Sequence, residues 1–125
     1  MIGYCTLGTN DLLKATAFYD VLMEKFGARR VLTLDRGVFY GVSSLELGVL
    51  LPADGQPARV GNGNMVALQA ESRGQVEDLY AQALALGASD EGAPGVRGAD
   101  PDGFYGAYFR DPEGNKLCVY RIGPA

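Results

Sequence analysis

The sequence predicts an α+β fold in which one β-α-β-β-β module occurs twice. Three observations support this prediction: an amphipathic helix follows a short apolar strand in both halves, the halves share a common residue offset, and a Pro/Gly-rich connector separates them. The modules span residues 1–52 and 64–125, and the linker spans residues 53–63. Together they form a single domain of 125 residues, whose curved mixed sheets we expect to enclose a cup.

The first module opens with a short apolar strand, Gly3–Gly8, which is bounded by turn residues. Three candidate N-caps follow it, at residues 9–11, and Gly27 ends the helix. The helix is predicted from apolar side chains that recur every three or four residues: Leu12, Ala15, Phe18, Tyr19, Leu22 and Phe26. Three strands come next, at Arg30–Leu34, Gly37–Ser43 and Leu45–Leu51.

The second module begins with a strand at Met65–Ala70, and Ser72 is the candidate cap of a helix that Gly87 ends. The glycine-rich stretch Gly92–Gly103 is predicted to be irregular, as a lid, a subunit contact or a disordered tip. Two strands complete the module, at Phe104–Arg110 and Lys116–Arg121.

The repeat rests on matched positions. Ala15 and Val76 lie 61 residues apart, and the same offset pairs Tyr4 with Met65. Phe39-Tyr40-Gly41 also recurs as Phe104-Tyr105-Gly106. Amphipathic helices can resemble one another without any repeat, but an offset shared by strand and helix favours two modules.

Strand alternation then assigns faces to the first strand of each module. The side chains expected under the helices are the apolar set Cys5, Leu7, Val66 and Leu68. The opposite face, which would line the cup, carries Tyr4, Thr6, Met65 and Ala67. Apolar walls with a few polar groups suit a small organic ligand.

Composition and charge argue against binding to nucleic acid, spanning a membrane and secretion. The net charge of −4 with scattered cations leaves no basic stripe for nucleic acid, and no apolar run is long enough to span a membrane. The two cysteines, Cys5 and Cys118, are too few for a disulfide framework, and no secretory signal is evident. We therefore expect a cytoplasmic protein.

The chain contains no histidine. This excludes a Ser-His-Asp triad, a Cys-His pair and every metal site built on histidine. Proton transfer near neutral pH would need a carboxylate, tyrosine, thiol or amine with a shifted pKa, or a bound water.

Several segments resemble the vicinal oxygen chelate superfamily, which includes glyoxalase I, bleomycin-resistance proteins, fosfomycin-modifying enzymes and extradiol dioxygenases. The resemblance covers nearly the whole chain, and its most specific segment is the turn Asp111-Pro112-Glu113-Gly114-Asn115 before the last strand. Tyr4–Leu12, Ala17-Phe18-Tyr19 and Gly61-Asn62-Gly63 also match. The resemblance implies the glyoxalase fold and a homodimer.

In metal-dependent members of that superfamily, the ligands lie on the first, fifth and last strands, and glyoxalase I adds one on the fourth. The resemblance places these positions at Tyr4, Met65 and Cys118, with the fourth near Gly48. A phenol, a thioether and a thiol do not suit a hard divalent metal, so we expect no metal cofactor. A soft ion such as Cu(I) is the alternative, although Met and Cys also commonly line pockets.

Other residues are candidates for ligand contacts or chemistry. Tyr108 matches a substrate-contacting tyrosine of the fosfomycin-modifying relatives, although it can equally be a packed strand residue. Tyr120 alternates with Cys118 onto the same face, so the expected ligand-binding set is Tyr4, Met65, Tyr108, Cys118 and Tyr120. Cys118 lacks a histidine base, which favours inert packing. Glu46, expected inside the fourth strand, and Tyr108 are the candidate acid/base groups.

Three functions remain open. The first is a metal-independent, homodimeric binder of a small organic ligand. The second is a glyoxalase-like lyase or isomerase, or a dioxygenase-family enzyme, with a non-standard or absent metal site. The third is a scaffold whose cup is filled by its own side chains. Fold alone does not choose among them.

Overall fold

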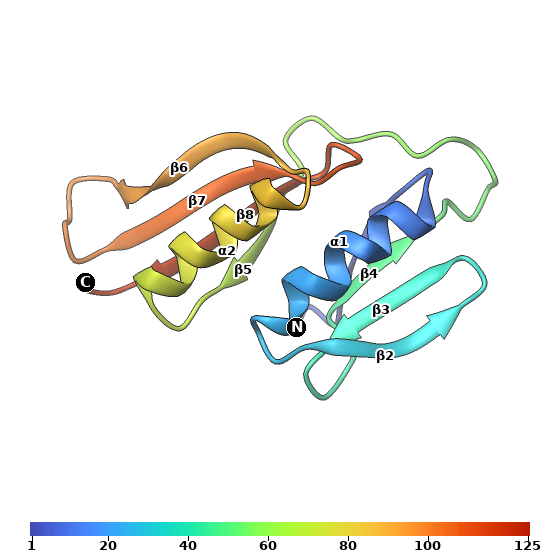
Figure 1. The fold of residues 1–125 in the computed structure, drawn as a ribbon, viewed down its shortest axis with the longest axis horizontal. Coiled ribbons are helices and arrows are strands. Elements are labelled where there is room, and N and C mark those ends of the chain that lie inside the picture. Colours follow the sequence, from blue (N-terminus) through green and yellow to red (C-terminus); the bar gives the residue numbers. More distant parts are fainter. The chain divides into compact units, whose positions relative to one another are not determined.

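A computed structural model describes all 125 residues. The chain divides into two compact units, Met1–Asn62 and Gly63–Ala125, each with one helix and one four-stranded mixed sheet. The α+β fold of two modules is thereby confirmed (Figure 1). The elements of the first unit are β1 (Cys5–Gly8), α1 (Leu12–Glu24), β2 (Arg29–Leu34), β3 (Gly37–Gly41) and β4 (Leu47–Leu50). Those of the second are β5 (Val66–Gln69), α2 (Arg73–Ala85), β6 (Ser89–Arg97), β7 (Phe104–Arg110) and β8 (Lys116–Ile122).

Both sheets have the same strand order. The first runs β1-β4-β3-β2 and the second β5-β8-β7-β6. The first strand of each unit pairs in parallel with the last, and the remaining pairs are antiparallel. Each helix covers one face of the sheet in its own unit (Figure 1). We call the other face of each sheet the outer face.

Both helices begin at predicted caps, but α1 ends at Glu24, so that Phe26 of the predicted apolar series lies beyond it. The Asp11 side chain accepts a hydrogen bond from the Lys14 amide, and Ser72 caps α2 in the same way through the Gln75 amide. Gly27 and Gly87 follow the helices with φ of 70° and 106°, the left-handed conformation that glycine adopts without strain. Each helix has 13 residues, and neither is long and apolar enough to cross a membrane.

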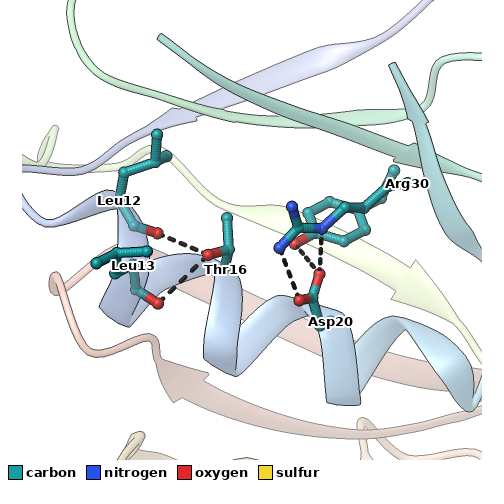
Figure 2. Close-up of polar contacts among 6 residues, drawn as sticks. Leu12, Leu13, Thr16, Asp20 and Arg30 are labelled. Carbon is teal, nitrogen blue, oxygen red and sulfur yellow. Dashed lines mark hydrogen bonds and ion pairs between the residues drawn. The ribbon is translucent and has the colours of Figure 1, made fainter. Parts of the chain in front are cut away.

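A polar network ties α1 to its sheet. The Arg30 guanidinium donates two hydrogen bonds of 2.8 Å to the Asp20 carboxylate, and the Tyr40 hydroxyl donates a third at 2.7 Å (Figure 2). These bonds, led by those from Arg30, lower the pKa of Asp20, whereas burial raises that of Tyr40. One turn earlier, the Thr16 hydroxyl bonds to the carbonyls of Leu12 and Leu13 within the helix (Figure 2).

The first strand of the chain lies less deeply than expected. Cys5 and Leu7 do share the helix-covered face, because they pair with the buried Leu47 and Val49. Cys5 is nevertheless exposed. The reason is that β1 forms an edge of its sheet, whereas α1 packs mainly against β2, β3 and β4.

The prediction of an irregular segment at Gly92–Gly103 is wrong over its first half. Strand β6 extends to Arg97 and pairs with β7 through two register irregularities. The sequence of β6 lacks a clear strand pattern because it contains glycines and Pro94, which are rare in strands. Both are tolerated here because β6 lies at the edge of its sheet. The remaining residues, 98–103, form a connection to β7 that is tied down by Arg73, whose guanidinium donates to the Pro101 carbonyl at 2.6 Å.

The turn before β8 is organised by one buried carboxylate. Asp111 Oδ1 accepts hydrogen bonds of 2.9 Å from the amides of Glu113, Gly114 and Asn115. Its Oδ2 accepts a fourth from the Asn115 side chain at 3.0 Å, and Gly114 has φ of 104°. These bonds fix the backbone of the turn that leads into β8.

The strand register confirms the 61-residue offset between the two modules but contradicts the match between the two Phe-Tyr-Gly triplets. Cys5 pairs with Leu47 as Val66 pairs with Leu117, which agrees with the offset between the first strands. However, Tyr40 pairs with Leu47, whereas Phe109 pairs with Leu117. Tyr108 therefore takes the place of Phe39, and Cys118 that of Gly48. The recurring Phe-Tyr-Gly triplet does not mark equivalent positions, because its second copy lies nearer the start of β7.

Candidate functional site

The outer face of the first sheet carries a shallow hollow of about 730 Å³. Its lining comes mostly from strand residues, and Arg36 contributes the one cationic side chain. The lining residues that define it are Tyr4, Thr6, Leu32, Leu34, Phe39 and Leu50. Leu32 and Leu34 are 40% and 43% exposed, so this unit leaves apolar side chains open on this face. A surface of this kind suits an organic ligand.

Tyr4 belongs to this hollow. It lies just before β1, and its ring meets Phe39 edge-to-face with ring centroids 5.1 Å apart. Phe39 in turn lies across Gly48, where an added Cβ would be only 2.7 Å from the ring. The ring therefore fills the space above the predicted fourth-strand ligand position.

A smaller hollow of about 520 Å³ adjoins the first and shares Arg36, Leu51, Pro52 and Ala53 with it. Asn10 contributes to its wall and holds the connector, because its side chain accepts from the Ala58 amide at 2.6 Å and donates to the Ala58 carbonyl at 3.1 Å. Arg36 donates to the Leu51 carbonyl at 3.1 Å. The connector is thus fastened beside the hollow.

The outer face of the second sheet brings together three of the predicted residues. Tyr108 lies directly across from Cys118 on the neighbouring strand, and Tyr120 follows two residues later on the same face. The Tyr120 ring stacks on Phe104 with centroids 5.2 Å apart and planes 5° from parallel. Met65 lies immediately before β5 and is 45% exposed.

The Cys118 thiol is almost completely buried. Burial raises its pKa, while the hydrogen bond from the Tyr108 hydroxyl and the charges of Arg97 and Lys116 act in the opposite direction. Burial is also the main cause that raises the pKa of Tyr108. Both groups therefore keep their protons at neutral pH, which agrees with a packing role for Cys118 rather than a nucleophilic one.

Glu46 does not occupy its predicted place. It precedes β4, is exposed, and accepts a hydrogen bond from the Val42 amide at 2.8 Å. The connection between the two strands is longer than predicted, because β3 ends at Gly41 and β4 begins at Leu47. Glu46 therefore lies in this connection and not in the strand. The Glu46 carboxylate stabilises the backbone of this connection by a local hydrogen bond.

Several residues of these faces were not predicted from the sequence. Phe39 and Arg36 border the hollow, and Arg97 and Lys116 flank Tyr108 on the second sheet. Alternation from Cys118 would have placed Lys116 on its face. No comparable signal existed for Arg97, because β6 was not recognised as a strand.

The residues at the expected ligand positions do not fit a hard divalent metal. Tyr4, Met65 and Cys118 offer a phenol, a thioether and a protonated thiol, and Gly48 lies under a phenyl ring. Nowhere do three His, Cys, Asp or Glu side chains come together in a group that could hold a metal ion.

Comparison with known proteins identifies the family. A sequence profile described as the glyoxalase/bleomycin resistance protein/dioxygenase superfamily matches residues 1–119. The chain is 35% identical to a glyoxalase/bleomycin resistance protein from Albidiferax ferrireducens T118, with a TM-score of 0.86 over 97% of this chain and 98% of that one. No curated protein matches it.

Two further crystal structures are similar. A lactoylglutathione lyase from Agrobacterium tumefaciens is 28% identical, with a TM-score of 0.66 over 97% of this chain and 92% of that one. A glyoxalase-related enzyme from Fulvimarina pelagi shares the fold at 24% identity, with a TM-score of 0.73 over 97% and 87% of the two chains. The profile match spans nearly the whole sequence, and the chain therefore belongs to the glyoxalase/bleomycin resistance protein/dioxygenase superfamily, also called the vicinal oxygen chelate superfamily.

Proposed function

We propose that this protein binds a small organic ligand without a metal ion. The observation that carries the proposal is the hollow of about 730 Å³ on the outer face of the first sheet. Its volume lies in the range typical of small-molecule sites, and its lining is mostly apolar with one cation and one tyrosine at the rim. The outer face of the second sheet carries tyrosines of its own, Tyr108 and Tyr120.

The donor atoms at the expected ligand positions support a function that needs no metal. Catalysis by the metal-dependent relatives needs hard ligands around an open coordination position. Tyr4, Met65 and Cys118 supply none, and the Phe39 ring blocks the position of Gly48. The hollow of the first sheet would therefore hold its ligand through apolar and aromatic contacts.

The proposal is tested with 2-naphthamide, a flat neutral probe, followed by amide NMR shifts in protein treated with EDTA. We expect saturable shifts at Tyr4, Thr6 and Phe39 that are unchanged when Zn²⁺, Ni²⁺ or Mn²⁺ is added. Thr6→Trp fills the hollow and should abolish these shifts, whereas the matched Thr6→Ser variant should keep them, with thermal unfolding as the check on folding. Binding that appears only with added metal, or shifts that survive in Thr6→Trp, would contradict the proposal.

A second candidate is a glyoxalase-like lyase or isomerase, or a related dioxygenase-family enzyme. It is favoured by the 28% identity to the lactoylglutathione lyase over nearly the whole chain. Formation of S-lactoylglutathione from methylglyoxal and glutathione tests the lyase directly. We expect no rate above the uncatalysed reaction with or without Zn²⁺ or Ni²⁺, because the ligand side chains are replaced. Acceleration that requires added metal would establish this candidate in place of the first.

The proposed binder is a homodimer that works in the cytoplasm. Dimerisation is supported by family membership and by the apolar side chains left open on the outer faces, such as Leu32 and Leu34. The free thiols Cys5 and Cys118 suit a reducing compartment.

A further inference from the structure

Two cations converge on one aromatic ring on the outer face of the second sheet. The guanidinium carbon of Arg97 lies 5.4 Å from the centroid of the Tyr108 ring, and the Lys116 ammonium lies 5.6 Å from it. They come from β6 and β8, the two strands that flank β7. Neither cation takes part in the ion pairs Arg30–Asp20 and Arg110–Glu91. This acidic protein therefore places two positive charges around one tyrosine.

The position of Arg97 is built into its strand. The side chain folds back along β6, and one terminal nitrogen donates to the Ala93 carbonyl at 2.6 Å. It lies over two glycines: an added Cβ would be 2.9 Å from the guanidinium at Gly95 and 3.2 Å from it at Gly92. Because Gly92 and Gly95 have no Cβ, the guanidinium has room to reach the Tyr108 ring.

The other side chains on this face also favour binding of a planar anion. Arg110 lies across from Lys116 and is already neutralised by Glu91 at 2.6 Å, so the face keeps a net positive charge. The stacked rings of Phe104 and Tyr120 extend the aromatic surface along the same strands. The buried Cys118 lies directly across from Tyr108 on the neighbouring strand.

We propose that this face binds the carboxylate of a small planar organic acid, which pairs with Arg97 and Lys116 while its ring rests against Tyr108, Tyr120 and Phe104. The inference rests on the proposed function of a small-molecule binder, extends it from the hollow of the first sheet to this face, and names the ligand class for this face. Two cations beside one aromatic ring create a local positive potential that favours an anion, and Arg–carboxylate pairs are among the strongest charged hydrogen bonds. Gly95 acts as a positioning residue, since it holds Arg97 in place without touching the ligand.

The test compares 2-naphthoate with 2-naphthamide, which has the same shape without the charge, by titration calorimetry and amide NMR shifts. We expect 2-naphthoate to bind about tenfold more tightly and to shift the amides of Tyr108 and Cys118. Arg97→Gln and Lys116→Gln should each weaken 2-naphthoate about tenfold and leave 2-naphthamide within about twofold. Gly95→Ala should weaken 2-naphthoate in the same direction with no change of charge, because its methyl group displaces the guanidinium.

Arg121→Gln is the matched control. It removes one positive charge from β8, but Arg121 pairs with Tyr105 on the helix-covered face, so 2-naphthoate affinity should stay the same. Equal affinities for the two probes, or an equal loss in Arg121→Gln, would overturn the inference, and 2-naphthamide binding would then leave the proposed function standing. If neither probe binds, both the inference and the proposed function fail.

Discussion

At the scale of single residues, the two cysteines occupy opposite environments. Cys118 is 1% exposed and burial raises its pKa, whereas Cys5 lies exposed on an edge strand. Thiolates, not thiols, react with alkylating agents, so both accessibility and pKa protect Cys118. The difference bears on function, because a nucleophilic role would require Cys118 to react readily.

We therefore predict that iodoacetamide modifies Cys5 at least about tenfold faster than Cys118 in the folded protein at neutral pH. Mass spectrometry of the labelled peptides measures the two rates. Denaturant should bring the rates within about threefold of each other, and Cys5→Ser should leave a protein that labels slowly. Rapid labelling of Cys118 in the native state would refute the packing role assigned to it.

At the scale of elements, β3 and β4 are joined on their outer face by Phe39 lying across Gly48. A Cβ at Gly48 would come within 2.7 Å of the ring, so Gly48→Ala should force Phe39 aside and lower the free energy of unfolding by about 1–3 kcal/mol. Urea unfolding measures this change. The double variant Phe39→Leu with Gly48→Ala should lose less than the sum of the single losses, and strict additivity would mean that ring and glycine do not interact.

The link between α1 and its sheet predicts a dependence on pH. The folded pKa of Asp20 lies below its ordinary value of 3.8, mainly because of the hydrogen bonds from Arg30. Its stabilising contribution is therefore fully present above that ordinary value and is lost as the pH falls through the folded pKa. Asp20→Asn should lower the melting temperature at about pH 7, and the difference from wild type should shrink below about pH 4.

Thermal unfolding across this range measures the effect. Asp35→Asn is the control, because Asp35 is an exposed turn carboxylate outside the network and its replacement should cost little at any pH. A deficit in Asp20→Asn that stays constant down to about pH 2 would show that the carboxylate charge is not what Arg30 and Tyr40 stabilise.

At the scale of the whole molecule, the outer faces leave apolar side chains uncovered within their own units. Such surface is usually buried by a ligand or by another subunit. We predict a homodimer, with a mass about twice the 13.3 kDa of one chain in analytical ultracentrifugation. Sedimentation as a monomer at about 100 μM would contradict the dimer.

Particular residues show how far the sequence could predict this protein. Helix periodicity, the caps at Asp11 and Ser72 and the turn at Asp111 are local signals, and the structure has each of them in place. The strand β6 is not predicted because Pro94 and two glycines weaken the strand pattern, and a proline is tolerated at a sheet edge, which is a property of the assembled sheet. Glu46 was misplaced because a short shift in a strand boundary moves a side chain from strand to turn.

Residue type and spacing are enough to predict the repeated architecture and the faces of the strands, because both follow from local periodicity. The contacts of Phe39 with Gly48, of Cys118 with Tyr108 and of Arg97 with the same tyrosine ring emerge only in the folded structure. These contacts join residues from different strands, and their register depends on bulges and turns that a periodic pattern does not encode.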